Sequence, residues 1–129
     1  MGLYFGQLAL YSKNVNELAA FLSELLEAEL RPADNAVRLI HGHFTMIIFE
    51  EPRSVATNNN MMVDFFLESR EELEELHQKA QFFTYRLRPT ESQQSIENIV
   101  SNIKNLNVIS YFFVTDTDGR KWKFSYREA

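Results

Sequence analysis

A strand-then-helix pattern occurs twice in this chain of 129 residues, and the two copies lie 55 positions apart. The first copy is GQLALYSKNVNELAAF, from Gly6 to Phe21, and the second is NMMVDFFLESREELEEL, from Asn60 to Leu76. In each copy a capping residue, Asn14 or Ser69, stands three positions before a glutamate, which is typical of the first turn of a helix. A duplicated module is the simplest explanation, so we expect two related modules with a cleft between them.

The apolar pattern predicts the elements of the first module. Leu8 to Ser12 is strand-like, and Asn14 to Glu29 carries apolar residues at helical spacing. Ala36 to Ile40 and Phe44 to Phe49 are two more strand-like runs. The sequence His41-Gly42-His43 between them predicts a tight hairpin turn.

The second module repeats this order. We expect a strand over Met61 to Glu68, a helix over Ser69 to Phe82, and strands over Phe83 to Leu87, Val108 to Thr115 and Lys121 to Tyr126. Between the expected strands Phe83 to Leu87 and Val108 to Thr115 the chain inserts TESQQSIENIVSNIKNL, with isoleucines and a leucine at helical spacing. The insertion predicts one extra amphipathic helix, at about 91–106.

The chain is expected to be a single domain. Its first module spans residues 1–52, a polar connector spans 53–60, and the second module spans 61–129. With 45% apolar residues the chain can bury a core of its own. The net charge of −5 disfavours nucleic acid as a partner, and no apolar run is long enough to cross a membrane. A cytoplasmic location follows as the default expectation.

Two segments carry a resemblance to a known family. LALYSKNVNELAAFLSELLEAEL and YFFVTDTDGRKWKFS resemble the opening and closing signatures of the vicinal oxygen chelate superfamily, which includes glyoxalases, extradiol dioxygenases and bleomycin resistance proteins. The family's closing signature commonly reads Asp-Pro-Asp-Gly followed by Glu. Here it reads Asp116-Thr117-Asp118-Gly119, with Lys123 in place of the Glu. The resemblance implies an α+β fold in which two βαβββ modules form a curved mixed sheet around a cleft, often as a homodimer.

Metal-dependent members of that family hold one divalent ion with His, Glu or Gln from four strands. The register carries these positions to Gln7, Met46, Met62 and Lys123. Only Gln7 could serve, because thioethers are poor ligands for hard ions and an ammonium repels them. We therefore predict that the usual metal centre is absent and that no cofactor replaces it. His41 and His43 are expected to be exposed turn residues; the alternative is that this His-x-His pair chelates a metal ion.

Without a metal, the cleft must bind through its shape, apolar contacts and a few polar groups. Strand alternation places Gln7, Ala9 and Tyr11 on one face, and Met46 and Ile48 are expected to join them. The matching face of the second module carries Met62, Asp64 and Phe66, with Lys121, Lys123 and Ser125. Tyr111 and Phe113 share a face. The candidate ligand-binding residues are Gln7, Tyr11, Met46, Met62, Asp64, Phe66, Tyr111, Phe113 and Lys123.

Asp64 stands out because a carboxylate on a mostly apolar strand is costly to bury unless it meets a cation. Lys123 could supply that cation. The pair is either an internal salt bridge or a polar anchor for a cationic or hydrogen-bonding ligand, and the sequence leaves both open.

Two classes of function compete, and we favour binding over catalysis. The first is a metal-free protein that holds an apolar or cationic small molecule between the modules, as bleomycin resistance proteins hold antibiotics. The second is a lyase or dioxygenase-like enzyme with an unorthodox metal site. A dimeric regulatory or interaction module is a further alternative, because the apolar stripe of the inserted helix could pack against a second copy.

Overall fold

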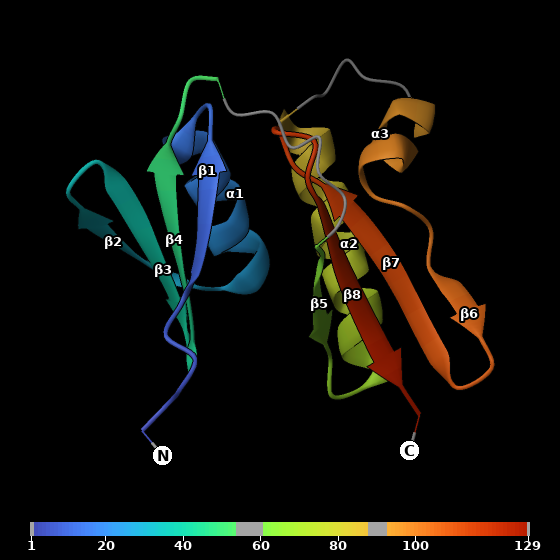
Figure 1. The fold of residues 1–129 in the computed structure, drawn as a ribbon. Coiled ribbons are helices and arrows are strands. Elements are labelled where there is room, and N and C mark those ends of the chain that lie inside the picture. Colours follow the sequence, from blue (N-terminus) through green and yellow to red (C-terminus); the bar gives the residue numbers. More distant parts are fainter. Residues whose placement is uncertain (1, 54–60, 88–92, 129) are drawn as a thin grey trace. The chain divides into compact units, whose positions relative to one another are not determined.

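The computed structural model describes residues 2–53, 61–87 and 93–128. The chain forms two compact units, residues 1–55 and 56–129, each built around a four-stranded sheet (Figure 1). Residues 54–60 of the predicted connector lie outside the described residues.

The described residues of the first unit form four strands and one helix. These are β1 (Leu8–Ser12), α1 (Val15–Leu26), β2 (Glu29–Ala33), β3 (Ala36–His41) and β4 (Phe44–Glu50). The strand order is β1-β4-β3-β2, with β1 and β4 parallel and the other pairs antiparallel. The predicted hairpin turn is confirmed: β3 and β4 are joined by Gly42 and His43, and Gly42 adopts a φ of +56°.

The second unit has the same topology with one addition. Its elements are β5 (Val63–Phe66), α2 (Arg70–Leu87), α3 (Gln93–Ile99), β6 (Lys104–Leu106), β7 (Ile109–Thr115) and β8 (Lys121–Arg127). The strand order β5-β8-β7-β6 repeats that of the first unit, and again the first and last strands are parallel. The predicted fold class is confirmed: α+β, with two modules of mixed sheet and a helix inserted in the second. None of the helices in the described part of the chain is long and apolar enough to cross a membrane.

Both predicted helix caps are confirmed. The Asn14 side-chain oxygen accepts a hydrogen bond from the Glu17 backbone N–H at 3.1 Å, and the Glu17 carboxylate accepts from the Asn14 amide at 3.2 Å. At the second helix the Ser69 hydroxyl accepts from the Glu72 N–H at 3.1 Å. Each cap satisfies an N–H group that the helix itself leaves without a partner.

Alanine at either cap is therefore expected to destabilise the protein. We predict that Asn14→Ala and Ser69→Ala each lower the free energy of unfolding by about 1 kcal/mol, measured by urea denaturation. Asn16→Ala, at an exposed position two residues further along in the first turn of α1, is the control and should change it by less than about 0.5 kcal/mol. Equal effects of Asn14→Ala and Asn16→Ala would contradict the capping role.

Each sheet buries one face against a helix (Figure 1). Buried α1 residues Leu18, Leu22 and Leu25 cover the first sheet. In the second unit, α2 covers a core of stacked rings, in which Phe124 lies 5.6 Å from Phe65 and 5.3 Å from Phe112 between centroids. The expectation that Tyr111 and Phe113 share a face is confirmed by the register of β7 and β8, which places Trp122 and Phe124 on the other face.

The predicted strand over Phe83 to Leu87 is wrong, because these residues form the end of α2. Their aromatic composition resembles that of a strand. However, Leu73, Ala80, Phe83 and Thr84 are buried on one helical face, and the Thr84 hydroxyl donates to the Ala80 carbonyl at 2.9 Å. Helical periodicity across the whole segment outweighs its local β-propensity.

The predicted helix at 91–106 is too long. Residues 91 and 92 lie outside the described residues, α3 ends at Ile99, and Lys104–Leu106 forms β6 instead. The chain leaves the helix because it attaches to β7: the Ser101 N–H donates to the Phe113 carbonyl at 2.9 Å, and the Ser101 hydroxyl accepts from the Phe113 N–H at 2.8 Å. Similarly, the first helix ends at Leu26, before the predicted Glu29, and β2 follows without having been predicted.

Candidate ligand-binding face

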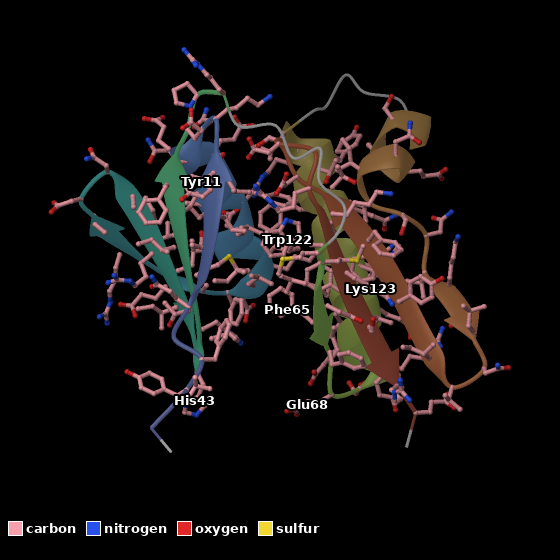
Figure 2. All side chains as sticks on the ribbon, viewed as in Figure 1. Tyr11, His43, Phe65, Glu68, Trp122 and Lys123 are labelled. Carbon is pink, nitrogen blue, oxygen red and sulfur yellow. The ribbon has the colours of Figure 1, made fainter. Side chains whose placement is uncertain are left out.

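Most of the predicted ligand-binding residues of the second module lie on one face of its sheet, opposite α2. We call this the helix-free face. Residues paired across neighbouring strands point to the same side of a sheet. Asp64 pairs with Lys123, and Lys123 pairs with Phe113. Phe66 and Tyr111 both pair with Ser125. The helix-free face therefore gathers Asp64, Phe66, Tyr111, Phe113 and Lys123. Trp122, next to Lys123 on β8, is buried on the α2 side; both side chains are labelled in Figure 2.

Asp64 is held by two polar neighbours on β8. The buried Ser125 hydroxyl donates to Asp64 Oδ1 at 2.7 Å, and Lys123 Nζ lies 3.6 Å from Asp64 Oδ2. The predicted ion pair is thus confirmed. Its side chains are 30% exposed for Asp64 and 25% exposed for Lys123, so solvent, or a ligand, can reach both groups.

Aromatic rings and ammonium groups alternate on this face. Lys123 Nζ lies 4.6 Å from the centroid of the Tyr111 ring, and Lys121 Nζ lies 5.9 Å from that of Phe113. The Tyr111 and Phe113 rings meet edge to face, with centroids 5.6 Å apart. Cation–π attraction holds each ammonium beside a ring without neutralising its charge.

The predicted position of Met46 is wrong. In the parallel pairing of β1 with β4, Met46 lies opposite Leu8 and Ile48 lies opposite Leu10. Both therefore share the α1 side of the sheet, and Met46 is 0% exposed. The face with Ala9 and Tyr11 carries Ile47 and Phe49 instead. The error was one of register: a shift by one residue moves a whole strand's side chains to the other face.

The remaining candidates lie at or before the strands. Tyr11 is 55% exposed and its ring lies 5.7 Å from that of Phe49 between centroids. Gln7 is exposed and precedes β1, while Met62 precedes β5 and is 48% exposed. These residues are accessible, and Gln7 and Tyr11 belong to the first unit, whereas the Asp64–Lys123 pair belongs to the second.

The residues at the family's ligand positions do not fit a divalent metal ion. Met46 is buried behind its sheet, and the Lys123 ammonium already faces Asp64 and Tyr111. Correcting the register of β4 replaces Met46 by Ile47, which has no donor atom at all. Among the described residues, no three His, Cys, Asp or Glu side chains form a group that could hold a metal.

The Asp-Thr-Asp-Gly turn between β7 and β8 is a structural element. Asp116 Oδ1 accepts from the backbone N–H groups of Asp118 and Arg120, both at 2.9 Å. Its Oδ2 accepts from the Arg120 guanidinium at 2.9 Å and from the Trp122 indole N–H at 3.0 Å. Because four donors surround this fully buried carboxylate, it fixes the turn and has no room for a ligand.

The histidines occupy structural or surface positions. His41 and His43 are exposed at the hairpin turn. His77 Nε2 lies 2.9 Å from the Ser101 carbonyl, and its ring packs edge to face on Phe112 with centroids 4.9 Å apart. His77 therefore ties α2 to the segment after α3.

Sequence reasoning missed three residues: two on the helix-free face of the second sheet and one on the first sheet, on the face that carries Tyr11. Lys104 lies opposite Tyr111, Arg127 lies opposite Ile109, and Phe49 lies beside Tyr11 in the first unit. Arg127 could have been found by continuing the alternation of Lys121, Lys123 and Ser125 to the end of β8. Lys104 could not, because its segment was assigned to a helix.

Solved structures similar to this chain share its whole fold. A fosfomycin resistance protein, FosX from Listeria monocytogenes complexed with Mn(II) and sulfate ion, has 16% identity, a TM-score of 0.70, and coverage of 98% of this chain and 93% of that chain. Lactoylglutathione lyase from Agrobacterium tumefaciens has 14% identity, a TM-score of 0.66, and coverage of 95% and 92%. A glyoxylase/bleomycin resistance protein/dioxygenase domain from Frankia sp. EAN1pec has 11% identity, a TM-score of 0.69, and coverage of 98% and 93%.

No protein-family model and no curated protein sequence matches the chain. The likeness is therefore one of structure, and at these identities it shows the fold and leaves the activity open. The chain has the two-module fold of these three structures, and its opening and closing segments resemble the signatures of the vicinal oxygen chelate superfamily.

Proposed function

We propose that this protein binds a small molecule without a metal ion, in the manner expected of a glyoxalase or bleomycin resistance type of binding protein. The observation that carries the proposal is the helix-free face of the second sheet. There, a lysine stands where the family's closing signature has a metal-binding glutamate, and it is held by Asp64 at 3.6 Å.

The composition of this face suits a flat ligand. Phe66, Tyr111 and Phe113 offer apolar surface, and Phe66 is 55% exposed. A few polar groups, here Asp64, Lys123 and Ser125, would orient the ligand, as they do in most small-molecule sites. The aromatic residues support the expectation of an apolar ligand. A cationic ligand would have to bind Asp64, whose carboxylate already faces Lys123 and Ser125.

The proposal predicts that ligand binding depends on Phe66. Flat aromatic compounds with neutral, anionic and cationic substituents would be screened by saturation-transfer NMR in buffer containing EDTA. For the compounds that bind, we expect Phe66→Ala to weaken affinity about tenfold, because losing an aromatic contact costs about 1–1.5 kcal/mol. Phe82→Ala is the matched control, since Phe82 is 63% exposed but lies on α2, and it should leave affinity unchanged.

Two outcomes would contradict the proposal. The first is the absence of binding by any compound, or binding that Phe66→Ala and Phe82→Ala weaken equally. The second is a stoichiometric divalent ion in the purified protein, detected by elemental analysis, whose removal by EDTA abolishes binding.

Homodimerisation and a cytoplasmic location belong to this proposal as well. Homodimerisation rests on the family resemblance alone. Light scattering coupled to size-exclusion chromatography tests homodimerisation, and a monomeric mass at micromolar concentrations would contradict it.

A further inference from the structure

The charges on the second sheet are strongly unequal between its faces. Five charged residues occur in its four strands, and the register places all of them on the helix-free face: Asp64, Lys104, Lys121, Lys123 and Arg127. Four of the five are basic, although the whole chain has a net charge of −5. The helix-free face is therefore a basic surface on an acidic protein.

The basic groups surround the aromatic rings. Lys104 lies opposite Tyr111 across β6 and β7, and Lys123 Nζ lies 4.6 Å from the same ring. Lys121 Nζ lies 5.9 Å from the Phe113 centroid. A ring stacked on Tyr111 or Phe113 would thus have ammonium groups beside its edge.

These cations have capacity for an external anion. Lys123 shares Asp64 with the Ser125 hydroxyl, and Lys104 and Arg127 are exposed and form no ion pair with another described residue. A cationic ligand would meet three or four like charges and would have to displace Lys123 from Asp64. An anionic ligand meets neither obstacle, and its contacts with ammonium or guanidinium groups would be charge-assisted.

We infer that the small molecule bound on the helix-free face is an aromatic anion, with a flat ring on Tyr111 and Phe113 and a carboxylate or similar acidic group toward the basic side chains. This inference rests on the proposed function and specifies the chemical class of its ligand. It replaces the cationic ligand that the sequence alone had suggested.

Three naphthalene compounds that share the ring and carry one small substituent of different charge test the inference: 2-naphthoate, 2-naphthalenemethanol and 2-naphthylmethylammonium. Their affinities would be measured by titration NMR at about 50 mM and about 500 mM NaCl. We expect 2-naphthoate to bind at least about tenfold more tightly than the ammonium compound at low salt. High salt should reduce that preference, because exposed charges are screened.

Variants locate the effect. The double substitution Lys104→Gln with Arg127→Gln should weaken 2-naphthoate binding several-fold and leave 2-naphthalenemethanol binding unchanged. Arg86→Gln, which removes a positive charge from α2 on the other side of the sheet, is the control and should change neither.

The outcomes separate this inference from the proposal beneath it. Equal or tighter binding of the ammonium compound overturns the anionic ligand but leaves small-molecule binding intact. An equal loss of 2-naphthoate affinity in Arg86→Gln shows a general charge effect and overturns the assignment to this face. If no compound of any charge binds here or in the broader aromatic screen, the proposed function itself fails.

Discussion

Asp116→Ala is expected to lower the free energy of unfolding by about 3–5 kcal/mol, the range seen when a buried, fully paired charge loses its partner. The carboxylate is 0% exposed and accepts four hydrogen bonds, from two backbone N–H groups, the Arg120 guanidinium and the Trp122 indole. Alanine would leave these donors unsatisfied and the guanidinium without its counter-charge. Urea denaturation, followed by the fluorescence of Trp122, measures the loss.

Two further variants sharpen this prediction. Asp116→Asn keeps one acceptor oxygen for the backbone N–H groups of Asp118 and Arg120, but its NH2 group cannot accept from the Arg120 guanidinium or the Trp122 indole. Because two of the four hydrogen bonds can remain, it should cost about half as much. Thr117→Ala changes an exposed residue of the same turn and should alter stability by less than about 0.5 kcal/mol. If Asp116→Ala were no worse than Thr117→Ala, the carboxylate would not organise the turn.

Met46→Glu is expected to be the second severe substitution, with a loss of about 4 kcal/mol or more, or no folded protein at all. In sequence this change restores a carboxylate to a position where the superfamily resemblance implies a metal ligand. In the structure Met46 is 0% exposed on the α1 side, opposite Leu8 and Leu39, so the new carboxylate would be buried among apolar side chains. Circular dichroism and urea denaturation would show the effect.

Met46→Leu is the matched control, because it preserves volume and polarity and should cost less than about 1.5 kcal/mol. Added Mn²⁺ should not rescue Met46→Glu, since the carboxylate points into the core. A stable Met46→Glu variant that binds Mn²⁺ would show that the register of β4 differs from the one described.

The elements that the sequence predicted correctly are those with a strong periodic or capping signal. The caps at Asn14 and Ser69 and the turn at Gly42 depend on local chemistry, which a single sequence displays directly. The Asp64–Lys123 pair could also be predicted, because β8 alternates between polar and apolar residues and Asp64 stands between apolar residues on β5. The module repeat then supplied the topology.

The two strands that were missed, β2 and β6, are both edge strands. Their side chains are almost all exposed, and β2 contains Pro32, which is tolerated at an edge but argues against a strand in a sequence. β1 and β5 are edge strands as well, but their partly buried apolar residues signal a strand, whereas the exposed residues of β2 and β6 carry little signal. The face of Met46 was missed for a related reason: β4 has three consecutive buried residues, Met46, Ile47 and Ile48, and no alternation from which to choose a face.

The parallel pairing of β5 with β8 bears on how the second unit is made. In its sheet β5 pairs only with β8. Their paired residues, such as Asp64 and Lys123, are more than 50 positions apart in the sequence. During synthesis β5 leaves the ribosome long before β8. The backbone groups of β5 therefore cannot form their hydrogen bonds with β8 until β8 has been translated. The helix-free face, which needs both strands, consequently cannot form before β8 has been translated.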